Sequence, residues 1–208
     1  FGLSDMVADT VQLIAACLDQ PTLVENRVTY DYRAAFRRFA GVDPLDAGSD
    51  ELAACCNADD DLRAAIGEDR DAWLDLILTT VVAPRFAPDQ LTVLQHYPAS
   101  MAALARLCPG DPQVADRFEI FIGERELANG YVELTDAAEQ RRRFEQETAL
   151  RQRSGLHAGP LDEQLLAALA AGLPPCAGVA LGVERLQMVL DQTDNIGDVV
   201  TFIPGNNV

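Results

Sequence analysis

The sequence lacks the features that mark membrane, secreted and disulfide-rich proteins. It has no run of about 18 apolar residues, the length typical of a membrane-spanning helix, and its first residues lack the basic start and apolar centre of a signal peptide. Its five cysteines are odd in number and form no C-x-x-C pair, which fits a reducing cytosol better than a disulfide framework or a zinc site. We therefore expect an untargeted, soluble protein of the cytoplasm.

Basic residues are also scarce. The 208 residues include 16 Lys and Arg against 33 Asp and Glu, a formal net charge of −17. Affinity for a phosphate backbone depends on clustered Lys and Arg, so this balance disfavours a bare nucleic-acid-binding module, although an acidic body can still bind a cation. Internal repeats and low-complexity linkers are absent, and we expect one domain over 1–208 with a helical insertion at about 46–88.

Hydrophobic periodicity predicts the order of helices and strands. Helices are expected at 4–18, 31–39, 50–56, 69–82, 136–153 and 161–171, strands at 27–30 and 90–95, and a loop at 110–116. Strands in hairpin-like succession, with helices between them, predict an α+β fold with a mostly antiparallel sheet flanked by helices.

One stretch near the C-terminus organises the functional interpretation. Residues 174–188 (PPCAGVALGVERLQM) combine an apolar run, glycines and an amphipathic segment, which predicts a buried strand that turns directly into a helix. Such a junction can hold an anion, because Gly182 lets a ligand approach the backbone, the helix start offers N–H groups, and Arg185 can grip phosphate oxygens. On this pattern alone, a core strand followed by a surface salt bridge is an equal alternative.

A second stretch, 118–134 (FEIFIGERELANGYVEL), predicts two strands around a glycine-containing turn. Four acidic residues lie in its mostly apolar setting.

Together these stretches resemble the catalytic core of class II aminoacyl-tRNA synthetases of the lysine type. Segment 126–136 (ELANGYVELTD) and segment 178–186 (GVALGVERL), the third signature motif of the class, are most similar to the short relatives that attach lysine to elongation factor P. The resemblance covers nearly the whole chain but only the C-terminal two thirds of the family's catalytic core. Two earlier motifs, one dimer-forming and one whose arginine holds the α-phosphate, are missing, and Glu184 stands where aspartate is usual.

The resemblance implies a site for ATP and Mg²⁺. Arg185 would be the catalytic residue that meets the γ-phosphate, and Glu119 and Glu126 would be the metal-binding pair, as hard oxygen ligands suited to magnesium that bridges phosphate oxygens. Without the resemblance, the alternative is that both glutamates are exposed strand residues paired with Arg117 and Arg125.

The resemblance also implies an amino-acid pocket. Asn129, Tyr131 and Glu133 share one strand face, because strand side chains repeat every two residues. An inward carboxylate beside an aromatic ring suits an ammonium group. By resemblance, Glu133 and Tyr131 recognise the side-chain amine, Asn129 supports the site, and the loop from Tyr97 to Ser100 lies near the substrate.

Ala180 bears on the choice of substrate. Lysyl-tRNA synthetases usually have glycine at this position, and the elongation factor P ligases have alanine. A methyl group in a tight pocket can discriminate substrates by about 1 to 3 kcal/mol. The resemblance to the ligases implies that the preferred substrate is (R)-β-lysine rather than lysine.

These features predict a ligase that activates lysine or (R)-β-lysine as an adenylate and transfers it to a lysine of elongation factor P, as a homodimer in the full-length protein. One alternative is a lysyl-tRNA synthetase that charges tRNA(Lys), and another is a non-catalytic ligand- or partner-binding module. Because two motifs are missing, we expect this chain to be part of a longer or naturally truncated protein. We also expect it to show no lysine-dependent pyrophosphate exchange alone.

Four further features have simpler explanations. Asp59, Asp60 and Asp61 suggest a metal site, but consecutive carboxylates on a surface turn are usually only solvated. His96 suggests acid/base chemistry, but a hydrogen-bonded structural histidine is commoner. The run 141–143 suggests RNA contact, yet a solvated helix face is the better explanation, and Trp73 is expected in the core.

Overall fold

The computed structural model describes residues 1–153 and 155–202. The helices are α1 (Leu3–Cys17), α2 (Thr22–Asn26), α3 (Tyr32–Phe39), α4 (Ser49–Cys55), α5 (Asp60–Ile66), α6 (Arg70–Ile77), α7 (Ala137–Arg153), α8 (Glu163–Gly172) and α9 (Val183–Asp191). Short turns of π or 3₁₀ helix are η1 (Leu78–Val82), η2 (Ala83–Arg85), η3 (Ala99–Met101) and η4 (Ile196–Asp198). The strands are β1 (Val28–Asp31), β2 (Leu91–Pro98), β3 (Leu107–Cys108), β4 (Asp111–Ile122), β5 (Arg125–Val132) and β6 (Ala177–Leu181).

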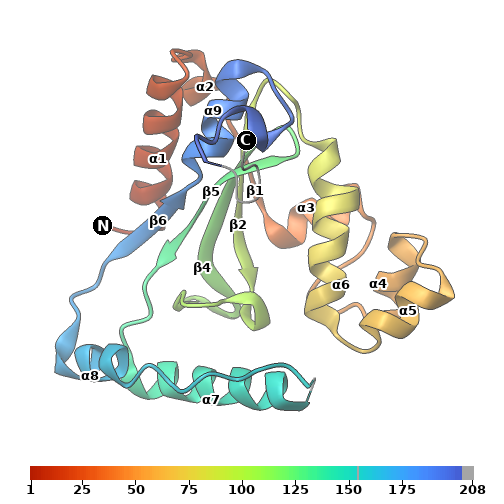
Figure 1. Cartoon of the computed structure of the whole chain (residues 1–208), viewed down its shortest axis with the longest axis vertical. Helices are drawn as coiled ribbons and strands as arrows, with labels where there is room; N and C mark the ends of the chain where they lie inside the picture. The colour runs from red at the N-terminus through yellow and green to blue at the C-terminus, as the bar shows by residue number, and fades with distance from the viewer. Residues whose placement is uncertain (154, 203–208) are drawn as a thin grey trace.

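Within these ranges, six strands form one sheet at the centre of the molecule (Figure 1). Their order is β1-β2-β4-β5-β6, with β3 beside β4. The β1–β2 pair is parallel and the other pairs are antiparallel. The predicted α+β architecture with a mostly antiparallel sheet is confirmed.

Helix α1 covers one face of the sheet. Its apolar side chains recur at helical spacing, so Val7, Val11 and Ile14 form one stripe that is at most 7% exposed. This stripe packs in one apolar cluster with Phe118 and Ile120 of β4. The predicted helix at 4–18 and the predicted strand at 27–30 are both confirmed to within a residue.

Helices α3, α4 and α6 cover part of the other face (Figure 1). Tyr32, Phe36 and Trp73 are at most 1% exposed and pack in one cluster with Tyr97 and Phe121 from the sheet. Trp73 is therefore a core residue, as predicted. Burial of these rings supplies much of the driving force that joins the helices of the 46–88 segment to the sheet.

Helix α5 and the start of β4 differ from the predictions, and the short elements α2 and β3 were not predicted either. Helix α5 was not predicted, because the Asp59–Asp61 run suggested a surface turn. In the structure, the Asp59 side chain instead accepts a hydrogen bond from the Leu62 backbone N–H at 2.9 Å and caps α5. The predicted loop at 110–116 is also wrong, because strand β4 begins at Asp111. Pairing with β2 and β3 extends β4 beyond its apolar part.

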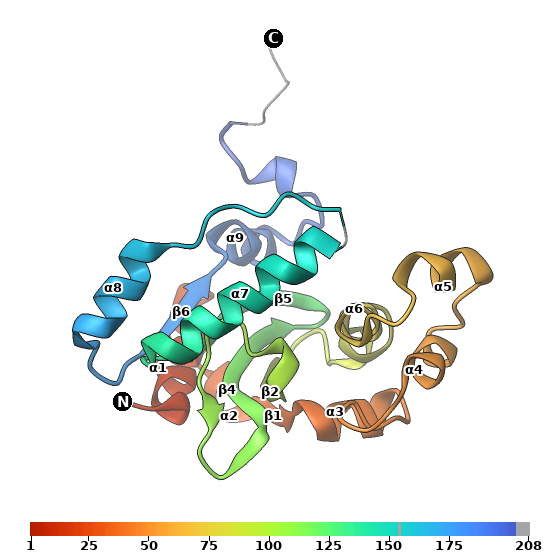
Figure 2. The ribbon, with the colours of Figure 1, turned by 90° about the horizontal axis from the view of Figure 1, so that it is seen from below.

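Helices α7 and α8 form an excursion between β5 and β6, and α7 runs across one end of the sheet (Figure 2). Both helices were predicted. Arg141 pairs with Glu163 at 2.5 Å and Arg142 with Glu139 at 2.7 Å, as expected for a solvated charged face. Arg143 differs, because its Nη1 donates to the carbonyl oxygens of Ala103 and Ala105 at 3.0 and 2.8 Å. These bonds anchor α7 to the segment that precedes β3. Within the described ranges, no helix has both the length and the apolar character needed to cross a bilayer.

Candidate active site

The predicted strand-to-helix junction is present, but its strand is not buried. Strand β6 lies at the edge of the described sheet, where Val179 is 38% exposed and Ala180 is also exposed. The N–H of Gly182 donates to the Leu127 carbonyl at 2.8 Å, and Gly182 is the N-cap of α9. This bond fixes the start of α9 against β5 and thereby places Arg185, in the first turn, over that strand.

Arg185 contacts Glu126 twice. Its Nη1 donates to the Glu126 carbonyl oxygen at 3.0 Å and to Oε2 at 3.1 Å. The two side chains remain 50% and 35% exposed, so a ligand can reach both. Glu126 is not paired with Arg125, the alternative partner, because Arg125 contacts Asp194 at 2.8 Å.

Glu119 is buried, contrary to the alternative of an exposed strand residue. It is 6% exposed, and Arg117 Nη2 donates to its Oε1 at 2.7 Å. The guanidinium carbon of Arg117 lies 4.4 Å from the ring centroid of Tyr97, and its Nη1 donates to the Met101 carbonyl at 2.7 Å. Burial raises the pKa of the Glu119 carboxyl, although the Arg117 charge opposes the shift.

A β-bulge decides which side chains share a face. Asn129 lies three residues after Glu126, so regular alternation would place the two on opposite faces. The pairing of β4 with β5 shifts next to Ile120 and leaves Leu127 as an extra residue. Both Glu126 and Asn129 therefore lie on the face that carries Glu119.

Glu119, Glu126 and Arg185 line one cleft of about 590 Å³. Four carboxylates and two guanidiniums line it in total, the others being those of Glu124, Asp194 and Arg125. A cleft with this surplus of oxygen donors suits a hard divalent cation such as Mg²⁺. The half-exposed guanidinium of Arg185 supplies a contact for a phosphate oxygen beside it.

Asn129, Tyr131 and Glu133 continue along the same face, beyond the cleft. Tyr131 and Glu133 are half-buried. Burial raises the pKa of the Glu133 carboxyl, and burial together with the Glu133 charge raises the pKa of Tyr131. A Cβ at Gly178 would stand 2.7 Å from Glu133 Oε1, so the carboxylate occupies space that this glycine leaves open. The arrangement favours a cationic ligand beside Glu133.

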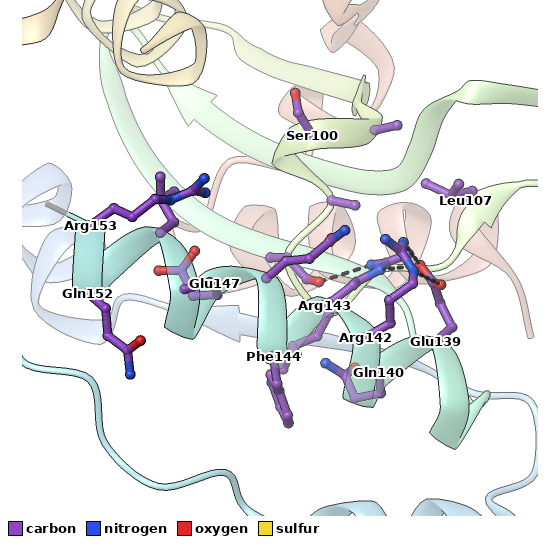
Figure 3. A pocket seen from close by; sticks show the side chains of 17 residues that line it. Ser100, Leu107, Glu139, Gln140, Arg142, Arg143, Phe144, Glu147, Gln152 and Arg153 are labelled. Carbon is purple, nitrogen blue, oxygen red and sulfur yellow. Dashed lines mark hydrogen bonds and ion pairs between the residues drawn. The ribbon is translucent and has the colours of Figure 1, made fainter. Parts of the chain in front are cut away.

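The structure places two predicted pocket residues differently. Ala180 is paired with Asn129 across β5 and β6, but it is exposed rather than enclosed. Ser100 donates to Asp71 Oδ1 at 2.7 Å and lines a different cleft, of about 1240 Å³, between η3 and α7 (Figure 3). Within the protein itself, a Cβ on Gly182 would contact the Arg185 side chain at an ordinary 3.5 Å.

Arg117 was not predicted as an inward-facing partner of Glu119, and Tyr97 was predicted only as part of a loop near the substrate. Arg117 Nε and Asn129 Oδ1 are buried and have no hydrogen-bond partner within the described chain. Burial and the nearby Glu119 charge raise the pKa of Tyr97. Unpaired buried polar atoms are costly, so their concentration on this face favours a polar ligand there. The sequence signal for Arg117 is its spacing of two residues from Glu119, which places both side chains on one face of the strand.

Comparisons with known proteins give matches over nearly the whole chain. Residues 19–206 match the family model described as tRNA synthetases class II (D, K and N). The chain is 43% identical over 203 residues to a protein of Sodalis glossinidius (strain morsitans) named elongation factor P–(R)-beta-lysine ligase. Proteins of the same name from Klebsiella pneumoniae (strain 342) and Avibacterium paragallinarum are 42% and 41% identical. These alignments cover 97% of this chain and 60% of each relative, so the chain spans about 60% of their length.

Proposed function

The chain belongs to the class II tRNA synthetases (D, K and N), and from this we propose that it activates lysine or (R)-β-lysine with ATP and transfers it to a lysine of elongation factor P. One observation carries the proposal. The cleft that contains Glu119, Glu126 and Arg185 opens on the same sheet face as Asn129, Tyr131 and Glu133. The residues proposed to bind phosphate and those proposed to bind the ammonium group would thus share one face of the sheet.

The nucleotide half fits ATP with Mg²⁺. Glu119 and Glu126 would hold the metal, and Arg185 would hold the terminal phosphate. When bound, ATP would supply the phosphoanhydride bond whose cleavage activates the amino-acid carboxylate. The residues of the chain position the two reactants, and Arg185 and the ion offset the negative charge that would otherwise keep them apart.

The amino-acid half explains the choice of an amine-bearing substrate. Glu133 carries a raised pKa because it is half-buried, and a substrate ammonium group would compensate its charge. Tyr131 on the same face presents an aromatic ring to that cation. A neutral side chain of equal length would leave the Glu133 carboxylate without a partner, so it should bind weakly.

Two observations favour elongation factor P as the acceptor. The relatives at 41% to 43% identity are named elongation factor P–(R)-beta-lysine ligase. A net charge of −17 also opposes binding of a polyanion such as tRNA. Because the family model also includes lysine-specific tRNA synthetases, the charging of tRNA(Lys) is the second candidate. We further propose a homodimer that acts in the cytoplasm, where five free cysteines remain reduced.

Binding tests the site directly. Calorimetric titration of the chain with lysine and with (R)-β-lysine, in the presence of ATP and Mg²⁺, should give saturable binding of at least one isomer. Glu133→Gln should abolish it, and Nε-acetyl-lysine, which lacks the charge, should not bind. Equal binding by wild type and Glu133→Gln contradicts the proposed amino-acid site.

Transfer decides between the acceptors. The full product of the reading frame is incubated with ATP, Mg²⁺ and each isomer, with either elongation factor P or tRNA(Lys). We expect a mass increase on elongation factor P. The 208 residues contain no lysine, so they offer no side-chain amine that competes as acceptor. Charging of tRNA(Lys) without modification of elongation factor P favours the second candidate.

A further inference from the structure

A cluster of three different metal-ligand side chains lies outside the cleft described above. His96, Cys108 and Asp116 each offer one ligand atom, and these atoms lie within 4.8 Å of one another. Asp116 is buried, and His96 and Cys108 are half-buried, so an ion can reach the cluster from solvent. None of the three residues takes part in the proposed lysine-activation site.

The cluster is assembled by three neighbouring strands. The pairing of β2 with β4 shifts between Gln95 and Tyr97, where Asp116 and Arg117 of β4 lie opposite the single residue His96. The φ of His96 is 57°, a left-handed conformation that is uncommon for residues other than glycine, and such a bulge redirects a side chain out of the regular alternation. Strand β3 brings Cys108 beside β4, which carries Asp116.

Existing hydrogen bonds already hold the three side chains. Cys108 Sγ donates to Asp116 Oδ1 at 3.0 Å, and Arg106 Nε donates to Asp116 Oδ2 at 2.8 Å. The Nδ1 atom of His96 lies 2.6 Å from Asp31 Oδ1. Because Nδ1 faces this carboxylate, Nε2 is the ring nitrogen without a hydrogen-bond partner in the described part of the chain.

We propose that His96, Cys108 and Asp116 bind a Zn²⁺ ion, with Asp31 orienting the imidazole. Nitrogen and sulfur ligands together select Zn²⁺ over the hard Mg²⁺ ion. A histidine that binds a metal through one nitrogen while a carboxylate holds the other is a common arrangement at zinc sites. Binding releases the thiol proton of Cys108 to solvent, and the thiolate replaces the Sγ–H···Asp116 hydrogen bond with a bond to the ion.

The proposal differs from a C-x-x-C zinc site, which the cysteine spacing argued against. The ligands come from three strands, so their spacing along the chain gives no recognisable motif. The site joins β2, β3 and β4 at positions next to Tyr97 and Arg117. With three protein ligands, the ion has a fourth position for a water molecule.

Co²⁺ tests the site, because a thiolate ligand gives a charge-transfer absorption band that oxygen ligands do not. Chelator-treated chain is titrated with Co²⁺ and the band is followed. We expect one Co²⁺ ion per chain and displacement by Zn²⁺. His96→Gln and Cys108→Ser should weaken binding by at least about tenfold, as loss of a metal ligand or its orienting partner does. The matched control Cys56→Ser should bind as wild type.

Several outcomes overturn the proposal. These are absence of a band in wild type, a band that persists in Cys108→Ser, and a band that is lost in Cys56→Ser. A second measurement does not depend on the variants folding. Zn²⁺ should slow alkylation of Cys108 in wild type, as mapped by peptide mass, and leave the exposed Cys17 unaffected. Equal alkylation rates at Cys108 with and without Zn²⁺ contradict the site. The Glu119 and Glu126 carboxylates give no thiolate band, so the result is independent of the proposed ligase activity.

Discussion

The carboxylate of Glu133 occupies the space that a side chain on Gly178 would fill. A Cβ built on Gly178 stands 2.7 Å from Glu133 Oε1, closer than real Cβ contacts. Gly178 of β6 therefore sets the position of a carboxylate that lies just after the neighbouring strand β5. Its importance comes from this cross-strand contact and not from its own backbone conformation.

Gly178→Ala should displace Glu133 and weaken binding of the substrate amine. Loss of a hydrogen bond to a charged group costs about 1.5 to 3 kcal/mol, which corresponds to a roughly 10- to 150-fold rise in Kd. Calorimetric titration with lysine or (R)-β-lysine measures the change. Gly159→Ala is the control, because nothing lies within 4 Å of a Cβ built there. An unchanged Kd in Gly178→Ala contradicts the assigned role of Glu133.

Glu133→Gln should stabilise the ligand-free chain at neutral pH. Burial raises the pKa of Glu133 in the folded state above its usual 4.5, so the folded chain holds this proton more tightly than the unfolded chain. The resulting stability is complete below pH 4.5 and is lost as the pH rises through the folded-state pKa. The Tm of Glu133→Gln should therefore exceed that of wild type at about pH 7 and match it at about pH 4.

The control for this pH profile is Glu145→Gln, on the exposed surface of α7. It should follow the wild-type profile throughout. A difference between Glu133→Gln and wild type that does not grow with pH contradicts the proposed cause.

Arg117→Ala should destabilise the fold strongly. Glu119 is 6% exposed and its partner Arg117 would be lost, which leaves a buried charge uncompensated at a cost of about 3 to 5 kcal/mol. Urea unfolding measures the free energy. Adding Glu119→Gln to Arg117→Ala should recover part of the loss, because the amide carries no charge. If the double variant is as unstable as the single one, charge burial is not the reason.

Arg185→Ala should weaken binding of ATP with Mg²⁺ by roughly 10- to 150-fold, the effect of removing a hydrogen bond to a charged group. Arg185 is half-exposed and rests on Glu126, so its removal should leave the fold intact. Arg141→Ala, on α7 and paired with Glu163, is the matched control and should bind ATP as wild type. Equal affinities of the two variants contradict the phosphate contact.

Ala180→Gly should reduce the preference for (R)-β-lysine over lysine. A methyl group that touches the substrate discriminates by about 1 to 3 kcal/mol. Ala180 is exposed in the structure, so the effect depends on direct contact with the substrate rather than on an enclosed pocket. The ratio of the two dissociation constants measures it, and an unchanged ratio contradicts this role.

Much of the fold follows from local patterns. The helices α1, α3, α7 and α8 were predicted from apolar spacing and caps, and the β4–β5 hairpin from two apolar runs around Gly123. Helix α5 and the first half of β4 were missed because their residues are polar. The Asp59 cap and the pairing with β2 and β3 form these elements, and neither has an apolar signal.

The sequence by itself determined the family, through the segments at 126–136 and 178–186, and it determined which residue types are available for phosphate, metal and ammonium contacts. Only the tertiary structure decided which of them meet. A single extra residue at Leu127 brings Glu126 onto the face of Asn129, and the edge position of β6 exposes Ala180. Register shifts and edge positions arise from pairing between distant strands, so local periodicity carries no trace of them.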